Sequence, residues 1–256
     1  MDKEIEKIAE VAAMLWQKNW AECNGGNISV NLTTCIDERI STSGAKTKCI
    51  PLQDSYPELA NNVFFISGAG KRMRDLAKDP LGCGSIIKIN SGGKSYHFLP
   101  ENAPVPSSEF PSHLAIQRCF KQIGSKNKAV LHTHPTELVA LSHCEPFLDA
   151  ELLTQTLWSM IPEAQIIVPK GIGIVPYELP GSIELAHSTI CQLKKYDVVL
   201  WEKHGVLSVG EDIIQCFDFI DTLNKSAQIY IFAHSAGFVP QGLNPEQLKG
   251  IKDKYC

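Results

Sequence analysis

The stretch Val130-Leu131-His132-Thr133-His134-Pro135 ends an apolar run with two histidines that are one residue apart. The apolar run predicts a buried strand, and the proline after His134 predicts a helix that opens directly behind it. Side chains alternate across a strand, so His132 and His134 would point the same way. Two neighbouring imidazoles form half of a metal site, although an isolated His-x-His also occurs as a purely structural pair.

A third histidine, His204, occupies a similar setting later in the chain. It follows the apolar run Val198-Val199-Leu200-Trp201 and precedes Gly205, which lets the backbone pack closely. Three neutral imidazoles leave one position of a zinc ion open for a substrate, as catalytic zinc sites require. His204 is therefore a candidate third ligand beside His132 and His134, and a structural role for these histidines stays open at this point. The other histidines lack such a setting, and helix packing or exposure to solvent is expected for them: His97, His113, His143, His187 and His234.

The composition is that of an ordinary soluble globular protein. Of its 256 residues 44% are hydrophobic and 20% are charged, and the formal net charge is -4. No basic stripe of the kind that binds nucleic acid is present, and no apolar run is long enough to span a bilayer. The charged residues 1–7 include no apolar export signal, so we expect a cytoplasmic protein.

The nine cysteines are odd in number and scattered, and no Cys-x-x-Cys pair occurs among them. Free thiols in a reducing cytosol are therefore expected, and a disulfide framework is not. The lack of cysteine pairs also argues against a structural zinc finger.

Apolar periodicity predicts an alternation of helices and strands. Helices are expected over residues 3–20, from about 110, from 135, over 146–160, over 182–196 and in a last long segment after 211. Strands are expected over residues 28–32, 63–66, 85–90, 95–99, 130–133, 164–168, 173–175 and 197–202. Residues 33–60 fit neither period. The pattern predicts one α/β domain over residues 1–256, with a central, largely antiparallel sheet flanked by helices.

Glu109 is the candidate acid–base group. It lies in Pro106-Ser107-Ser108-Glu109-Phe110-Pro111, where a serine N-cap and a proline in the first turn indicate the start of a helix. Proton transfer in carbon chemistry needs a carboxylate beside the reacting atom, and a metal site can tune its pKa. The alternative is a glutamate placed at a helix N-terminus for the helix dipole. Glu163 has no such context in the sequence.

Two glycine loops, Asn24-Gly25-Gly26-Asn27 and Ser67-Gly68-Ala69-Gly70-Lys71, adjoin predicted strands. Glycine lets backbone N–H groups approach an anion, but a plain tight turn explains either loop equally well. The residues Lys71-Arg72-Met73-Arg74 add positive charge beside the second loop. These basic residues would either steer a phosphorylated substrate or lie on a solvated face of a helix.

Taken together and in order, these segments resemble the class II aldolase family over nearly the whole chain. The His-x-His and His-Gly pairs are shared with fuculose-phosphate aldolases and ribulose-phosphate epimerases. The Asn-Gly-Gly-Asn loop and the long interval between Gly70 and Glu109 favour the branch that acts on L-rhamnulose 1-phosphate. The segments that carry the resemblance are 24–29, 67–71, 106–113, 132–134, 157–158 with Glu163, 171–176, 201–205 and 221–228.

The resemblance implies a zinc-dependent lyase that cleaves L-rhamnulose 1-phosphate to dihydroxyacetone phosphate and L-lactaldehyde by retro-aldol chemistry. It implies one Zn²⁺ per subunit and a fourfold homotetramer. It implies that His132, His134 and His204 bind Zn²⁺ and that Glu109 is a proton shuttle and candidate fourth ligand. It implies that phosphate is bound by Asn24, Asn27, Gly70 and Ser108. It gives Glu163 a role at the reacting carbons, in its own or a neighbouring subunit.

One departure concerns the second glycine loop. Ala69 stands where the family pattern has a serine that can touch phosphate, so phosphate would be held there by backbone N–H groups. Two alternatives therefore stay open. One is an aldolase or 4-epimerase that acts on another ketose phosphate, such as fuculose or ribulose phosphate. The other is a metal-binding homologue that uses the fold for assembly without catalysis.

Overall fold

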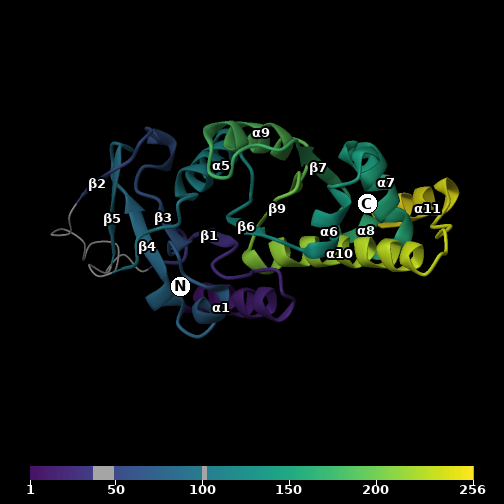
Figure 1. Cartoon of the computed structure of the whole chain (residues 1–256). Coiled ribbons are helices and arrows are strands. Elements are labelled where there is room, and N and C mark those ends of the chain that lie inside the picture. The colour runs from purple at the N-terminus through teal and green to yellow at the C-terminus, as the bar shows by residue number, and fades with distance from the viewer. Residues whose placement is uncertain (37–48, 100–102, 256) are drawn as a thin grey trace. The chain divides into compact units, whose positions relative to one another are not determined.

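The structure is a computed structural model that describes residues 1–36, 49–99 and 103–255 (Figure 1). The chain divides into two compact units, the first formed by residues 1–133 with 209–214 and the second by residues 134–208 with 215–256. The expectation of one domain over residues 1–256 stays a prediction.

The first unit contains six strands in the order β2-β5-β4-β3-β1-β6, and every neighbouring pair is antiparallel. The strands are β1 (Asn27–Asn31), β2 (Ile50–Pro51), β3 (Val63–Ser67), β4 (Gly84–Ile89), β5 (Ser95–Phe98) and β6 (Ala129–Thr133). The helices are α1 (Asp2–Gln17), η1 (Pro57–Leu59), α3 (Met73–Leu76), α4 (Pro80–Cys83) and α5 (Phe110–Gln122).

The register of these strands brings three strand ends to one edge of the sheet. Asn27, at the start of β1, is paired with His132, near the end of β6. The Oγ of Ser67, the last residue of β3, accepts a hydrogen bond of 3.0 Å from the backbone N–H of Ile28. The two glycine loops and the first histidine are therefore neighbours at this edge, although they lie far apart in the sequence.

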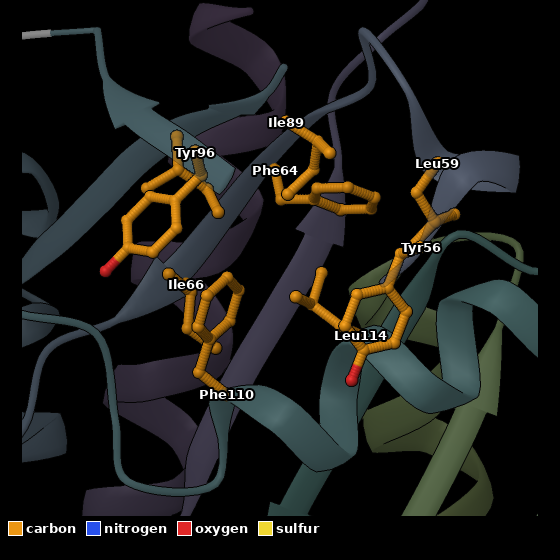
Figure 2. Packing of buried hydrophobic residues seen from close by; sticks show 9 residues of the cluster. Tyr56, Leu59, Phe64, Ile66, Ile89, Tyr96, Phe110 and Leu114 are labelled. Atoms are coloured by element: carbon orange, nitrogen blue, oxygen red, sulfur yellow. The ribbon is translucent and has the colours of Figure 1, made fainter. Parts of the chain in front are cut away.

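An aromatic and aliphatic core fixes α5 against this sheet (Figure 2). Phe64 and Ile66 alternate along β3 and face Phe110 and Leu114 in the first two turns of α5. The ring of Tyr96 meets that of Phe110 edge to face, with centroids 5.4 Å apart. Each of these buried side chains contributes about 1.5–3 kcal/mol of transfer free energy. The start of α5, and with it Glu109, is consequently held in place by its own core contacts.

The second unit contains the β8–β9 hairpin, and β7 runs parallel to β8. The strands are β7 (Ile172–Val175), β8 (Val198–Trp201) and β9 (Gly205–Gly210), which the second unit contains as far as Ser208. The helices are α6 (Thr136–Leu141), η2 (Glu145–Leu148), α7 (Ala150–Met160), α8 (Pro162–Ile167), α9 (Ile183–Leu193), α10 (Ile213–Ser235) and α11 (Pro245–Tyr255). The side chain of Ser182 caps α9 by accepting a hydrogen bond from the N–H of Leu185, as its place before that helix indicates.

The predicted α/β class, with a largely antiparallel sheet flanked by helices, is confirmed, and the parallel pair β7–β8 makes the sheet mixed. The prediction of a strand over residues 164–168 is wrong, because these residues lie in or directly after α8. Pro162 occupies the first turn of that helix, where a missing N–H costs nothing, and a short apolar run alone cannot distinguish strand from helix.

Other boundaries differ from expectation for local reasons. The helix expected over 146–160 is divided, because Asp149 begins α7 by accepting a hydrogen bond of 2.8 Å from the N–H of Leu152. The strand expected over 197–202 ends at Trp201. Within the irregular stretch 33–60 the short elements β2 and η1 occur, and residues 37–48 lie outside the described residues.

Two further observations concern the described part of the chain. None of its eight cysteines takes part in a disulfide bond. None of its helices combines the length and the apolar character needed to cross a bilayer.

Candidate active site

The structure brings His132, His134 and His204 together. One ring nitrogen from each histidine lies within 4.8 Å of those of the other two. His132 is buried in β6, whereas His134 and His204 are half-buried, and the rings of this second pair have centroids 5.5 Å apart. The i, i+2 spacing at the strand end thus places its two imidazoles as side-chain alternation predicts.

The turn between β8 and β9 holds His204. Lys203 adopts a left-handed backbone conformation, with φ 58°, and its N–H donates a hydrogen bond of 2.8 Å to the buried Oγ of Ser142. The ring of Trp201 lies 5.1 Å from that of His204, and its indole N–H donates to Thr189 on α9. A backbone hydrogen bond and a packed indole therefore fix the turn that carries the histidine.

Glu202 supports the same turn by electrostatic contacts. Its carboxylate pairs with the ammonium of Lys203 at 2.7 Å and accepts a hydrogen bond of 2.9 Å from the N–H of Tyr177. These contacts, that with Lys203 first, lower the pKa of Glu202 below its usual value. The contacts therefore favour the ionised form of this carboxylate in the turn that carries His204.

The three imidazoles suit a divalent transition metal. Zinc binds imidazole nitrogen at about 2.0–2.1 Å, so three tetrahedral ligands lie roughly 3.4 Å apart. Nitrogens within 4.8 Å of one another reach that spacing through small ring movements. A set of three neutral nitrogens favours zinc over magnesium or calcium, which prefer oxygen ligands. The donor set therefore fits the expected ion.

Glu109 is directed toward the start of β1 and not toward its own helix. It is the N-cap residue of α5, yet its side chain forms no capping hydrogen bond. Instead, Oε2 accepts a hydrogen bond of 3.0 Å from Nδ2 of Asn27, the residue paired with His132. This contact argues against a placement for the helix dipole alone, and the acid–base role of Glu109 stays a prediction.

His113 completes this cluster and was not anticipated from the sequence. It is 2% exposed, and its Nε2 lies 2.5 Å from Oδ1 of Asn27, while its Nδ1 lies 2.7 Å from Oγ of Ser29. Burial lowers the pKa of His113 to about 3. The available signal was its spacing of four residues from Glu109, which places both on one face of α5.

The first glycine loop closes tightly on β6. Gly26 has φ +78°, and a Cβ added to it would lie 2.9 Å from the carbonyl oxygen of His132. Glycine is thus required here both by the backbone conformation and by the close approach to the first histidine. Asn24 is exposed in the turn just before it, whereas Asn27 is buried.

The second glycine loop is tied to the segment before α5. Gly68 forms an antiparallel bridge with Pro106, and the N–H of Ser107 donates to the carbonyl of Ser67 at 2.9 Å. Gly70, with φ +68°, and Ser108 are both exposed, and their segments lie side by side because of this bridge. The Gly70 loop, Ser108 and Asn27 therefore belong to the same edge of the sheet.

Glu163 is exposed in the first turn of α8, in the second unit. It does not belong to the group of three histidines. Its role at the reacting carbons stays a prediction.

Comparison with known proteins shows the family of the chain. The family model of the Class II Aldolase and Adducin N-terminal domain matches residues 6–231. The chain is 49% identical to a rhamnulose-1-phosphate aldolase of Bacteroides thetaiotaomicron over 247 residues, which is 96% of this chain and 92% of that protein. It is 34% identical to a rhamnulose-1-phosphate aldolase of Escherichia coli, over 98% of this chain and 93% of that protein.

Solved structures show the same fold. A sugar-phosphate aldolase from Thermotoga maritima superposes with a TM-score of 0.80 at 35% identity, over 94% of this chain and 99% of that one. An L-fuculose 1-phosphate aldolase superposes with a TM-score of 0.63 at 18% identity, over 100% of this chain and 97% of that one.

Proposed function

The chain belongs to the family of the class II aldolase and adducin N-terminal domain, and on that premise we propose that it is a metal-dependent lyase that cleaves L-rhamnulose 1-phosphate to dihydroxyacetone phosphate and L-lactaldehyde. The observation that carries this proposal is the group of three imidazoles within 4.8 Å. The Glu109 carboxylate supports it, because it accepts a hydrogen bond from Asn27, the residue paired with His132.

The metal that we propose is Zn²⁺, one per subunit, bound by His132, His134 and His204. Bound by three neutral imidazoles, zinc supplies a Lewis acid that stabilises negative charge on a substrate oxygen. The chain then needs no lysine to form a Schiff base with the ketose. The buried position of His132 and the fixed turn of His204 support a preorganised site.

Glu109 is the proposed proton carrier. Cleavage transfers the proton of the carbon-4 hydroxyl to the ionised Glu109 carboxylate, breaks the bond between carbon-3 and carbon-4, and leaves the electron pair on the three-carbon fragment. The Glu109 carboxyl group then delivers a proton to carbon-3 of that fragment, as a general acid held near the reacting atom. Its hydrogen bond to Asn27 holds it at the histidine edge of the sheet, which supports this assignment.

The substrate phosphate is proposed to bind Asn24, Asn27, Gly70 and Ser108. Asn27 donates one amide hydrogen to Glu109 and retains a second that can reach a phosphate oxygen. Lys71 and Arg72 are exposed beside the Gly70 loop and would steer an anion toward it. Ala69 offers no hydroxyl, and the N–H groups of Gly68, Ala69 and Lys71 already donate to backbone carbonyls. The N–H of Gly70 is therefore the backbone donor that we assign to the phosphate. Such remote binding aligns the reacting carbons.

Assembly and location follow the same family premise. We propose a fourfold homotetramer in the cytoplasm, in which Glu163 acts at the reacting carbons of its own or a neighbouring subunit. The exposure of Glu163 in the first turn of α8 supports a role at a subunit contact. The described cysteines, none of them in a disulfide, suit a reducing compartment.

Product analysis tests the proposed reaction. Zinc-loaded protein is incubated with dihydroxyacetone phosphate and L-lactaldehyde, and the sugar phosphate that forms is identified by NMR. We expect L-rhamnulose 1-phosphate, and we expect none from chelator-treated protein. Parallel assays with L-fuculose 1-phosphate and L-ribulose 5-phosphate test the alternative substrates. Faster turnover of either one, with zinc bound, would overturn the assignment of the sugar; no turnover of any would favour a non-catalytic homologue.

A further inference from the structure

A chain of hydrogen bonds runs from the buried interior of the first unit to Glu109. It begins at Ser29 on β1, passes through His113 on α5 and Asn27 on β1, and ends at Oε2 of Glu109. We propose that His113 is a positioning residue, which fixes the orientation of the Asn27 carboxamide and thereby holds the Glu109 carboxylate for proton transfer. This inference rests on the proposed role of Glu109.

The donors and acceptors in this series of hydrogen bonds permit one arrangement. An ionised carboxylate only accepts, so Asn27 must present its NH₂ group to Glu109. Its carbonyl oxygen then faces His113, whose Nε2 must carry the hydrogen because the two atoms lie 2.5 Å apart. The other ring nitrogen, Nδ1, is consequently unprotonated and accepts from the hydroxyl of Ser29 at 2.7 Å. A neutral ring is what the pKa of His113, lowered by burial, requires.

Burial makes this arrangement hard to break. Ser29 and His113 are each 2% exposed and Asn27 is 5% exposed, so water cannot readily replace a lost partner. If the carboxamide turned over, its oxygen would face the carboxylate, and two acceptors would meet without a hydrogen. An unsatisfied buried polar group costs about 1–3 kcal/mol. The imidazole and the carboxylate therefore hold the amide from its two ends.

Strand and helix geometry aligns the residues of this hydrogen-bond series. Ser29 and Asn27 are two residues apart on β1 and so share one face of the strand, while His113 lies one helical turn beyond Glu109 on α5. Phe110, between them, is buried in the core of Figure 2. Since a displacement of about 1 Å at a reacting centre can cost 10²-fold in rate, a fixed carboxylate has a direct kinetic consequence.

Three variants of zinc-loaded protein test the inference. His113→Leu removes both ring nitrogens, and we expect kcat to fall by about 10- to 100-fold while KM and zinc content change little. His113→Gln keeps a side-chain N–H for Asn27, and we expect it to recover most of kcat. The matched control is His97→Leu, because Nδ1 of His97 also contacts an asparagine, Asn90, at 2.8 Å. We expect wild-type kcat from that control.

Two further measurements separate positioning from folding. In zinc-loaded wild-type protein, ¹⁵N NMR of His113 at neutral pH should show a protonated Nε2 and an unprotonated Nδ1. In a double-mutant cycle, His113→Leu should add almost nothing to the loss caused by Glu109→Gln, because one acts through the other.

The outcomes that contradict the inference are distinct from those that contradict the role of Glu109. An Nδ1–H tautomer, or full kcat in His113→Leu, would refute the positioning role even if Glu109→Gln is slow. Additive losses in the double variant would refute it as well. Wild-type kcat in Glu109→Gln would instead remove the proposed proton carrier, and the positioning role would fall with it.

Discussion

At the scale of single residues, the site depends on which atom each side chain presents to its neighbour. Asn27 presents an N–H to Glu109 and an oxygen to His113, and reversal of either contact would set like groups against each other. To bind the proposed metal, His132, His134 and His204 must likewise present unprotonated nitrogens. Small changes in hydrogen-bonding capacity should therefore affect chemistry more than folding.

Replacement of Glu109 by Gln tests this directly. The amide cannot deliver a proton in the way that a carboxyl group does, so we expect turnover to slow by about 10²–10⁴-fold. Zinc content should remain at the wild-type level, since the three imidazoles are unchanged. Atomic absorption and an aldol assay on the same purified sample would measure both. Loss of zinc together with activity would instead show that Glu109 acts as a necessary ligand.

The pH dependence of stability tests the neutral state of His113. Its pKa is about 3 in the folded protein and near 6.5 in an unfolded chain. Between these values the unfolded state binds a proton that the folded state does not, so stability is lost as pH falls through this window. From about pH 6 to pH 5 we expect wild type to lose about 1 kcal/mol more than His113→Gln. Urea unfolding of both proteins at each pH would show it; parallel losses would contradict the prediction.

At the scale of elements, strand ends and tight loops determine where the functional groups lie. The first glycine loop approaches β6 so closely that a Cβ on Gly26 would contact the His132 carbonyl, whereas nothing lies within 4 Å of a Cβ on Gly70. Both glycines have positive φ, so they differ in crowding and not in backbone conformation. This difference provides a matched pair of substitutions.

Gly70→Ala should cost about 1 kcal/mol of unfolding free energy, from backbone strain alone. Gly26→Ala should cost more, because the added methyl group displaces the end of β6 or the loop itself. We also expect weaker zinc binding in Gly26→Ala, since His132 belongs to the displaced segment. Denaturant unfolding and competition with a chelator measure the two effects. Equal costs and unchanged zinc affinity in the two variants would show that the close approach has no consequence.

Elements were predictable where a local pattern is sufficient. The strand before His132 was expected from its apolar run, and the start of α5 from the proline and serine around Glu109. The helix α8 was mistaken for a strand because a short apolar run has no resolvable period. The strand β9 was missed because its glycine and serine have little strand propensity and its pairing with β8 supplies the stability.

At the scale of the whole molecule, the site combines segments that no local pattern connects. His204 follows His134 by a long interval, and Ser29 precedes its partner His113 by 84 residues. The three histidines that the structure brings together were nevertheless candidates from the sequence, because each stands in a recognisable setting at the end of an apolar run. His113 was not, because a histidine within a helix is usually a packing residue and its partners lie on another element.

The binding of one metal ion by three histidines is the central claim, and metal content measured together with aldol activity tests it most directly. Wild-type protein should carry one zinc per subunit, and activity should fall in proportion as a chelator removes it and return when zinc is restored. His132→Ala should lack both zinc and activity. Full turnover of L-rhamnulose 1-phosphate by protein shown to be free of metal would contradict the account.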